Sequence, residues 1–283
     1  MIRTVGVRAI ALTSAVVIIL AACSAAPSPD PTSIKGKFDV GGRSLYVECS
    51  GSGSPTVVMD AGLGNTHDTW RLVAPMIAKH TRTCTYDRAN LGASDPAAKP
   101  RSSAEVIADL DALLKAAAIS GPYVLVGHSF GGLSMRLFAA EHPADVVGIV
   151  LVDPTPVTFV DRECAIVTKA LCDALRKGWE PSANPEGLDF FKTVAEVLAA
   201  GPLPTVPLVV LAATNHHQAA ITDSAIEQQI ETLWRDEETK LAASVAGGTL
   251  TVVTSGHDIE LLHPAAVIDA LNSVLAAAGV SPS

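Results

Sequence analysis

A serine between two glycines is the first candidate for chemistry. The segment GHSFG, residues 127–131, follows an apolar run and precedes a helical pattern. A chain that passes from strand to helix at a single residue needs glycine two positions before and after it, because a Cβ there would clash. The hydroxyl of Ser129 would then stand above the C-terminal edge of a sheet, where open α/β sheets bind ligands. We therefore expect Ser129 to be a nucleophile.

A serine nucleophile needs a base within hydrogen-bond reach, and the base needs an acid that orients it. His257 lies in the segment VVTSGHDIELLHP, directly after the last expected strand. Histidine can accept and return a proton near neutral pH, and a loop at this place can reach over the sheet edge. The sequence therefore predicts His257 as the general base.

Alternating strand and helix patterns provide the framework for these residues. A hairpin is expected over 36–49, strands over 56–62, 81–87, 123–127, 146–153, 206–214 and 248–255, and helices over 67–80, 102–119, 131–142, 222–246 and 263–278. In the first of these helices Pro75 is expected near a start or a kink. This alternation predicts a parallel sheet with right-handed crossovers. Residues 155–205 break the alternation with prolines and helical pieces, and we expect them to form a helical insertion over the sheet edge.

Composition limits the classes of function. The chain has 283 residues, 48% of them hydrophobic, and a formal charge of −9. It can bury a sizeable core, and its negative charge argues against nucleic-acid binding. We expect no metal site and no cofactor, since the cysteines lack zinc spacing and the glycine-rich loops match no nucleotide motif. The pair His216-His217 is interpreted as loop residues.

Five segments together resemble the α/β-hydrolase superfamily, in its branch of small esterases with a cap. They are VVMDAGLGNTHDTW, TCTYDRANLGASDP, GPYVLVGHSFGGLSMRLFAAEHP, GIVLVDP and SGHDIELLHP, which span most of residues 36–278. The resemblance implies an eight-stranded, mostly parallel sheet flanked by helices, with strand order 1-2-4-3-5-6-7-8. It also implies a cap after strand six, at about 155–205, and a small-molecule acyl substrate.

The position of the acid departs from the usual pattern of this superfamily. Members usually carry the acid after strand seven, where this chain has Asn215 and two histidines. Some members carry it after strand six, where this chain has Asp153. Asp153 is our expected acid, with capping of the following turn as its alternative role. Asp223 is the second candidate, although it could equally cap a helix, and Asp258 is expected to point elsewhere.

The resemblance also suggests the oxyanion hole and the disulfides. One N–H donor is expected from Phe130, directly after the nucleophile, and the other from Leu63, in the loop after strand three. His67, Asp68 and Trp70 follow that loop, and either pocket lining or structural roles fit them. Neighbouring strands in the implied sheet order, and a helical hairpin in the cap, suggest the pairs Cys49–Cys84 and Cys164–Cys172.

The N-terminal segment indicates export. Two arginines precede an apolar stretch that ends in LAAC, which resembles the lipobox of bacterial lipoproteins. We expect a signal peptide over 1–22, lipidation of Cys23, a flexible tether over 23–35 and the hydrolase domain over 36–283. Removal of Arg3 and Arg8 changes the charge from −9 to −11. The alternatives are an ordinary cleaved signal peptide and an uncleaved anchor.

These features together predict an exported serine hydrolase, held at the membrane by its lipidated N-terminus. It would cleave a carboxylic ester or a related acyl bond through an acyl-enzyme. An acyltransferase or perhydrolase with the same three residues is the first alternative. A catalytically inactive, lipid-anchored binding protein is the second, and the missing carboxylate after strand seven favours it.

Overall fold

The fold is built on one sheet of eight strands. The computed structural model describes residues 1–2, 33–216 and 221–280, and the fold belongs to the unit Pro31–Ser283. The strands are β1 (Ile34–Asp39), β2 (Ser44–Ser50), β3 (Thr56–Asp60), β4 (Thr83–Tyr86), β5 (Tyr123–His128), β6 (Val146–Val152), β7 (Leu208–Asn215) and β8 (Thr249–Gly256). Their order is β1-β2-β4-β3-β5-β6-β7-β8, which confirms the expected order and the α/β-hydrolase fold. β2 runs antiparallel to β1 and β4, and the other neighbours are parallel.

The helices and short 3₁₀ turns follow the strands along the chain. They are η1 (His67–Trp70), α1 (Ala74–Ile77), α2 (Ser103–Ala116), α3 (Phe130–Glu141), α4 (Phe159–Cys164), α5 (Lys169–Gly178), η2 (Pro181–Ala183), α6 (Phe190–Ala199), α7 (Ser224–Ala243), α8 (Ile259–Leu262) and α9 (Pro264–Ala277). Over 67–80, where helical spacing with a start or a kink at Pro75 was expected, the chain forms η1 and then α1. Pro75 lies in the first turn of α1, where its missing N–H and fixed φ are tolerated.

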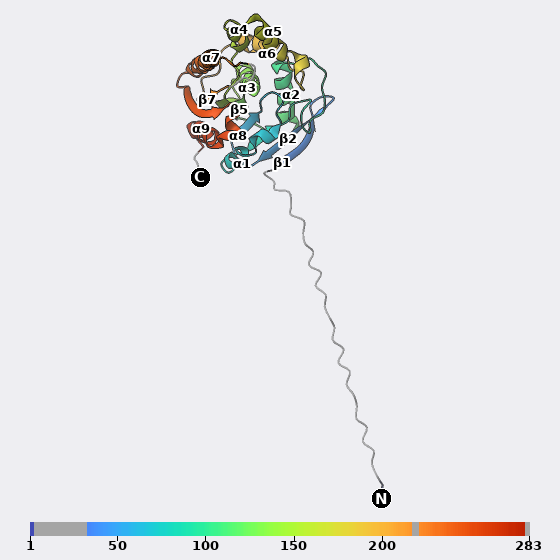
Figure 1. The fold of residues 1–283 in the computed structure, drawn as a ribbon. Helices are drawn as coiled ribbons and strands as arrows, with labels where there is room; N and C mark the ends of the chain where they lie inside the picture. The colour runs from blue at the N-terminus through green and yellow to red at the C-terminus, as the bar shows by residue number, and fades with distance from the viewer. Residues whose placement is uncertain (3–32, 217–220, 281–283) are drawn as a thin grey trace. The chain divides into compact units, whose positions relative to one another are not determined.

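Helices cover both faces of the sheet (Figure 1). The central strand β5 shows why, because its side chains alternate between two apolar cores. Leu125 packs into the core shared with α2 and α3, whereas Val124 and Val126 pack into the core shared with α1 and α9. The C-terminal ends of β5, β6 and β7 therefore sit between two packed layers, which makes this sheet edge a rigid support for functional side chains.

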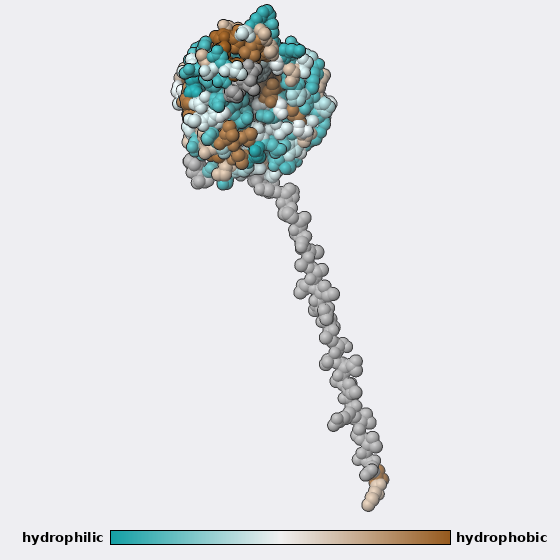
Figure 2. Space-filling model, in the orientation of Figure 1, coloured by the Kyte–Doolittle hydropathy of each residue, from teal (hydrophilic) through white to brown (hydrophobic). Residues whose placement is uncertain are grey.

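The segment between β6 and β7 carries α4, α5, η2 and α6. Aromatic rings join these helices: Trp179 lies 5.7 Å from Phe159 and 4.6 Å from Phe190, measured between ring centroids. Phe191 and Leu198 of α6 are exposed. Figure 2 shows a brown apolar area over the part of the surface where Figure 1 places these helices. The description of residues 155–205 as a cap stays a prediction.

Two cysteine pairs lie at disulfide distance. Cys49 and Cys84 are register partners on β2 and β4, with sulfur atoms 2.08 Å apart. The sulfur atoms of Cys164 and Cys172, from α4 and α5, are 2.02 Å apart. The fifth cysteine, Cys23, lies outside the described residues, as do almost all of the expected signal peptide and tether. Within the described ranges, every helix is too short or too polar to cross a bilayer.

Candidate active site

Ser129 occupies the sharp turn between β5 and α3. Its backbone has φ 51° and ψ −120°, a strained conformation for a residue with a side chain. A Cβ at Gly127 would lie 2.6 Å from the carbonyl oxygen of Gly131, and one at Gly131 would lie 2.5 Å from the carbonyl oxygen of Ala61. Glycine at both positions is therefore required by close backbone approach, as the sequence pattern indicated.

Three residues from distant parts of the chain meet at this turn. The Oγ of Ser129 lies 2.9 Å from Nε2 of His257, and Nδ1 of His257 lies 2.5 Å from Oδ2 of Asp153. These are the distances at which Ser129 donates its proton to His257 while His257 donates to the carboxylate. The structure thus brings together the expected nucleophile, base and acid.

Asp153 is held firmly where β6 ends. Its backbone φ is 43°, and its N–H donates to the carbonyl of Leu211 at 2.8 Å. The Ala213 N–H donates to Oδ1 at 2.6 Å, which leaves Oδ2 for the imidazole of His257. Burial opposes ionisation of this carboxyl, but the hydrogen bonds from His216 and His257 outweigh it and hold the pKa of Asp153 far below its usual range. Asp153 is therefore a carboxylate at neutral pH.

A second histidine shares that carboxylate. The Nε2 of His216 lies 2.9 Å from Oδ2 of Asp153, and its Nδ1 lies 2.8 Å from Oε2 of Glu231. Burial disfavours the charged imidazole, but the hydrogen bonds and charges of these two carboxylates outweigh it and raise the pKa of His216 to about 9. The indole of Trp234 stacks on the ring, with centroids 4.1 Å apart. His216 is therefore an imidazolium at neutral pH.

This role of His216 was missed in the sequence. The sequence predicts loop residues for the pair His216-His217, since adjacent histidines point in different directions and no third metal ligand is evident; His217 lies outside the described residues. The sequence carried one signal of this role: a histidine stands after β7, where the acid is expected, and an aspartate stands after β6 instead. When the acid follows β6, the residue after β7 lies beside the same carboxylate.

His128, inside the GHSFG segment, supports the loop that carries His257. Its Nε2 lies 3.1 Å from the carbonyl oxygen of His257, and its Nδ1 lies 3.2 Å from Oε1 of Glu260. Burial, aided by the charge of His257, lowers the pKa of His128 to about 3, and burial raises the pKa of Glu260 to about 8. Both groups are uncharged at neutral pH, so Nε2–H donates to the carbonyl and Nδ1 faces a protonated carboxyl group.

The two expected oxyanion donors lie on segments that touch. A Cβ at Gly62 would lie 2.9 Å from Nδ1 of His128, so the loop 61–63 packs against the nucleophile turn. Within the described part of the chain, the backbone N–H of Leu63 and that of Phe130 have no hydrogen-bond acceptor. Two unpaired donors close to a serine are what an oxyanion needs, and the roles of Leu63 and Phe130 remain a prediction.

A cavity of about 510 Å³ opens over the nucleophile. It is lined by Ser129, Thr155, Phe159, Leu175, Trp179, Asn215, His216, Trp234, Gly256 and His257. The aromatic and aliphatic walls come from α4, α5 and α7, and the polar groups gather at the end where Ser129 lies. Thr155 also contacts the nucleophile, with its Oγ1 3.3 Å from Oγ of Ser129. Such a site suits a substrate with an apolar body and one reactive polar group.

Other expected candidates lie elsewhere. His67, Asp68 and Trp70 line a different pocket, in which His67 contacts Asp87 and Trp70 is fully buried. Asp223 caps α7, where its Oδ1 accepts the N–H of Ala225 at 2.8 Å.

Two groups of side chains bring metal-binding atoms within 4.8 Å of one another. They are Asp153, His216 and His257, and His128, Asp258 and Glu260. In the first group both imidazole N–H groups are directed at the same carboxylate oxygen, so hydrogen bonds account for their arrangement. In the second, Nε2 of His128 contacts the carbonyl of His257, and its Nδ1 faces the carboxyl group of Glu260, whose pKa burial raises to about 8.

Sequence comparisons find an α/β-hydrolase-fold profile and a putative hydrolase among the proteins to which this chain is similar. A profile of the family described as "alpha/beta hydrolase fold" matches residues 55–170. The uncharacterized protein YqjL of Bacillus subtilis is 29% identical over 231 residues, which cover 81% of this chain and 86% of that protein. A putative carbamate hydrolase, RutD of Azorhizobium caulinodans, is 31% identical, but that match covers only 40% of this chain and 42% of the relative.

Solved structures share the fold over nearly the whole described domain. The enol-lactonase from Burkholderia xenovorans superposes with a TM-score of 0.63 at 20% identity, covering 85% of this chain and all of that chain. The carboxylesterase CesB of Bacillus subtilis superposes with a TM-score of 0.57 at 17% identity, covering 86% of this chain and 91% of that one. The chain thus has the α/β-hydrolase fold, with hydrolases among its relatives.

Proposed function

We propose that this protein is a serine hydrolase that cleaves a carboxylic ester through an acyl-enzyme. One observation carries the proposal. The hydroxyl of Ser129, the imidazole of His257 and the carboxylate of Asp153 form an unbroken chain of hydrogen bonds at 2.9 and 2.5 Å. The same hydrogen bonding activates a serine in unrelated hydrolase folds, because it couples proton removal to nucleophilic attack.

The reaction has two halves. Ser129 Oγ attacks the ester carbonyl while His257 Nε2 takes its proton, and Asp153 stabilises the imidazolium that forms. The tetrahedral oxyanion accepts hydrogen bonds from the N–H groups of Phe130 and Leu63. Collapse expels the alcohol, which receives the proton from His257. Water, deprotonated by the same imidazole, then attacks the acyl-enzyme and releases the carboxylic acid.

The cavity walls suggest the substrate class. Phe159, Leu175 and Trp179 provide an apolar surface that would stabilise an acyl chain or an aromatic alcohol by burial. The imidazolium of His216 lies at the polar end and adds a positive charge beside the reacting atoms. The names of an enol-lactonase and a carboxylesterase with this fold give a lactone and a carboxylic ester as substrates. An ester or lactone with a short or medium apolar chain fits these features.

A single mass-spectrometric experiment tests the proposal. Purified protein is mixed with p-nitrophenyl acetate, quenched within the first turnover and analysed intact and after digestion. An added acetyl group on Ser129, absent in Ser129→Ala, is expected. A folded wild-type protein that releases nitrophenol without acylating Ser129 would contradict the mechanism. Adding methanol or hydrogen peroxide then separates the alternatives, since an acyltransferase or perhydrolase diverts most product to the ester or peracid.

We also propose that the protein is exported and lipidated. The basic residues, apolar stretch and LAAC segment at the N-terminus support lipidation of Cys23. Two or more acyl chains would hold it stably at a membrane. Metabolic labelling with a tagged fatty acid is expected to label the full-length protein and not Cys23→Ala. Labelling that survives this substitution would refute the assignment.

A further inference from the structure

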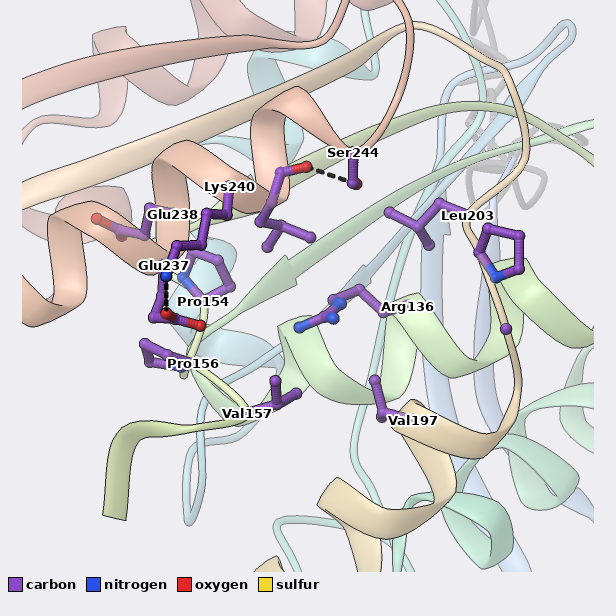
Figure 3. Close-up of a pocket in the computed structure, with 13 residues that line it drawn as sticks. Arg136, Pro154, Pro156, Val157, Val197, Leu203, Glu237, Glu238, Lys240 and Ser244 are labelled. Atoms are coloured by element: carbon purple, nitrogen blue, oxygen red, sulfur yellow. Dashed lines mark hydrogen bonds and ion pairs between the residues drawn. The ribbon is translucent and has the colours of Figure 1, made fainter. Parts of the chain in front are cut away.

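A second cavity, of about 250 Å³, lies beside the active site and shares no lining residue with the Ser129 pocket. It lies between α3, α6, α7 and the segment after β6. Seven apolar side chains line it: Pro154, Pro156, Val157, Val197, Pro202, Leu203 and Leu241. Arg136, two helical turns beyond Ser129 on α3, extends into this space, as Figure 3 shows.

Arg136, which is partly buried, differs from the two fully buried arginines of the described residues. Arg88 binds the carboxylates of Asp60 and Glu186, and Arg101 binds that of Asp109. The Nε of Arg136 is buried without a hydrogen-bond partner, and among the described residues its guanidinium forms no hydrogen bond or ion pair. A partly buried cation without a counter-ion is unfavourable, and an arginine offers five donors in a fork that matches a carboxylate.

The acidic neighbours offset this charge only in part, through the charge of Glu237. Glu237 lies at the cavity, but its Oε1 already accepts from Lys240 at 2.8 Å and from Arg162 at 2.8 Å. Figure 3 shows the Lys240 contact. Burial raises the pKa of Glu238 to about 10, with the nearby charge of Asp153 adding to that shift, so this group is uncharged at neutral pH. Burial lowers the pKa of Arg136 to about 10, which leaves it charged.

We propose that this cavity binds a small carboxylate, whose charged group pairs with Arg136 and whose short apolar tail contacts the proline and valine walls. The volume lies below the usual range for drug-sized ligands, so an acid of about four carbons suits it. Pro154 and Pro156 line this cavity, whereas Thr155 between them lines the Ser129 pocket. The bound acid therefore contacts the segment that separates the two sites.

Thermal unfolding with sodium butyrate at constant ionic strength tests the site. At about ten times its Kd, butyrate is expected to raise Tm by roughly 3–6 °C. Butyramide, which has the same shape and no charge, should give no such rise. In Arg136→Met the affinity should fall by about tenfold to a hundredfold, because charge-assisted hydrogen bonds are lost. The exposed Arg71→Met is the matched control and should respond as the wild type does.

Three results would overturn the proposal: no rise with butyrate in the wild type, an equal rise with butyramide, or an unchanged response in Arg136→Met. Binding in the Ser129 pocket would give the third result, because Arg136 does not line that pocket. If Arg136→Met does not fold, Arg136→Lys replaces it. That variant keeps the charge but loses the fork, so a Tm shift smaller than that of the wild type is expected, and an unchanged shift counts against the site.

Discussion

Replacing His216 by glutamine should change how stability depends on pH. Glutamine keeps an amide N–H that can reach Asp153 but cannot carry the charge. Folding raises the pKa of His216 from an ordinary 6.5 to about 9. At 1.36 kcal/mol per pKa unit, that rise of about 2.5 corresponds to roughly 3 kcal/mol. Because the folded pKa is raised, this stabilisation is fully present below pH 6.5 and is lost as pH rises through about 9.

The assay is urea unfolding of both proteins between pH 6 and pH 10. The difference in free energy of unfolding between the wild type and His216→Gln should be largest at pH 6. At pH 10 it should be smaller by about 3 kcal/mol. The side chain of His216 is only 5% exposed, so solvent screening removes little of this electrostatic stabilisation. Other titrating groups, such as Glu260, occur in both proteins and cancel. The exposed His263→Gln is the control, and a difference for His216→Gln that stays constant with pH would refute an imidazolium beside Asp153.

Three further predictions concern the turn, the acid and the pocket. Gly131→Ala should destabilise the fold by about 1–3 kcal/mol and impair turnover, because its Cβ would lie 2.5 Å from a backbone oxygen. Thermal unfolding measures this, and Gly178→Ala, whose Cβ has nothing within 4 Å, should be nearly neutral in that assay. Asp153→Asn should lower kcat roughly 10⁴-fold in ester hydrolysis, whereas Asp223→Asn should leave it within a few-fold; the reverse order would make Asp223 the acid. Trp179→Ala should lower the preference for longer over shorter acyl chains about tenfold in kcat/KM, and an unchanged preference would exclude the apolar wall from substrate binding.

Much of the fold could be predicted from the sequence, because the strand and helix periodicities are regular. The spacing of Gly127 and Gly131 also predicts the sharp turn at Ser129. Asp153 could be proposed only through the resemblance, since an aspartate before a proline also suits an ordinary turn. Over 67–80 the start or kink expected at Pro75 is the start of α1, but the pattern did not show that η1 before it is a 3₁₀ turn.

Two features that depend on contacts between distant residues could not be read from the sequence. The partnership of His216 with Asp153 joins the ends of two strands, and its strength depends on burial and on Glu231 one helix away. The isolation of Arg136 is likewise a property of packing, since nothing in the sequence of α3 shows that the surrounding carboxylates are engaged elsewhere or protonated. Such features require coordinates.

The central claim is that His257 activates Ser129, and active-site labelling with a fluorophosphonate probe measures this most directly. The probe phosphonylates a serine only when its hydroxyl is deprotonated as it attacks. We predict rapid labelling of the wild type at Ser129, no labelling of Ser129→Ala, and labelling slowed by several orders of magnitude in His257→Gln, with His263→Gln unchanged. Labelling of His257→Gln at the wild-type rate, or labelling of folded Ser129→Ala at another residue, would contradict the account.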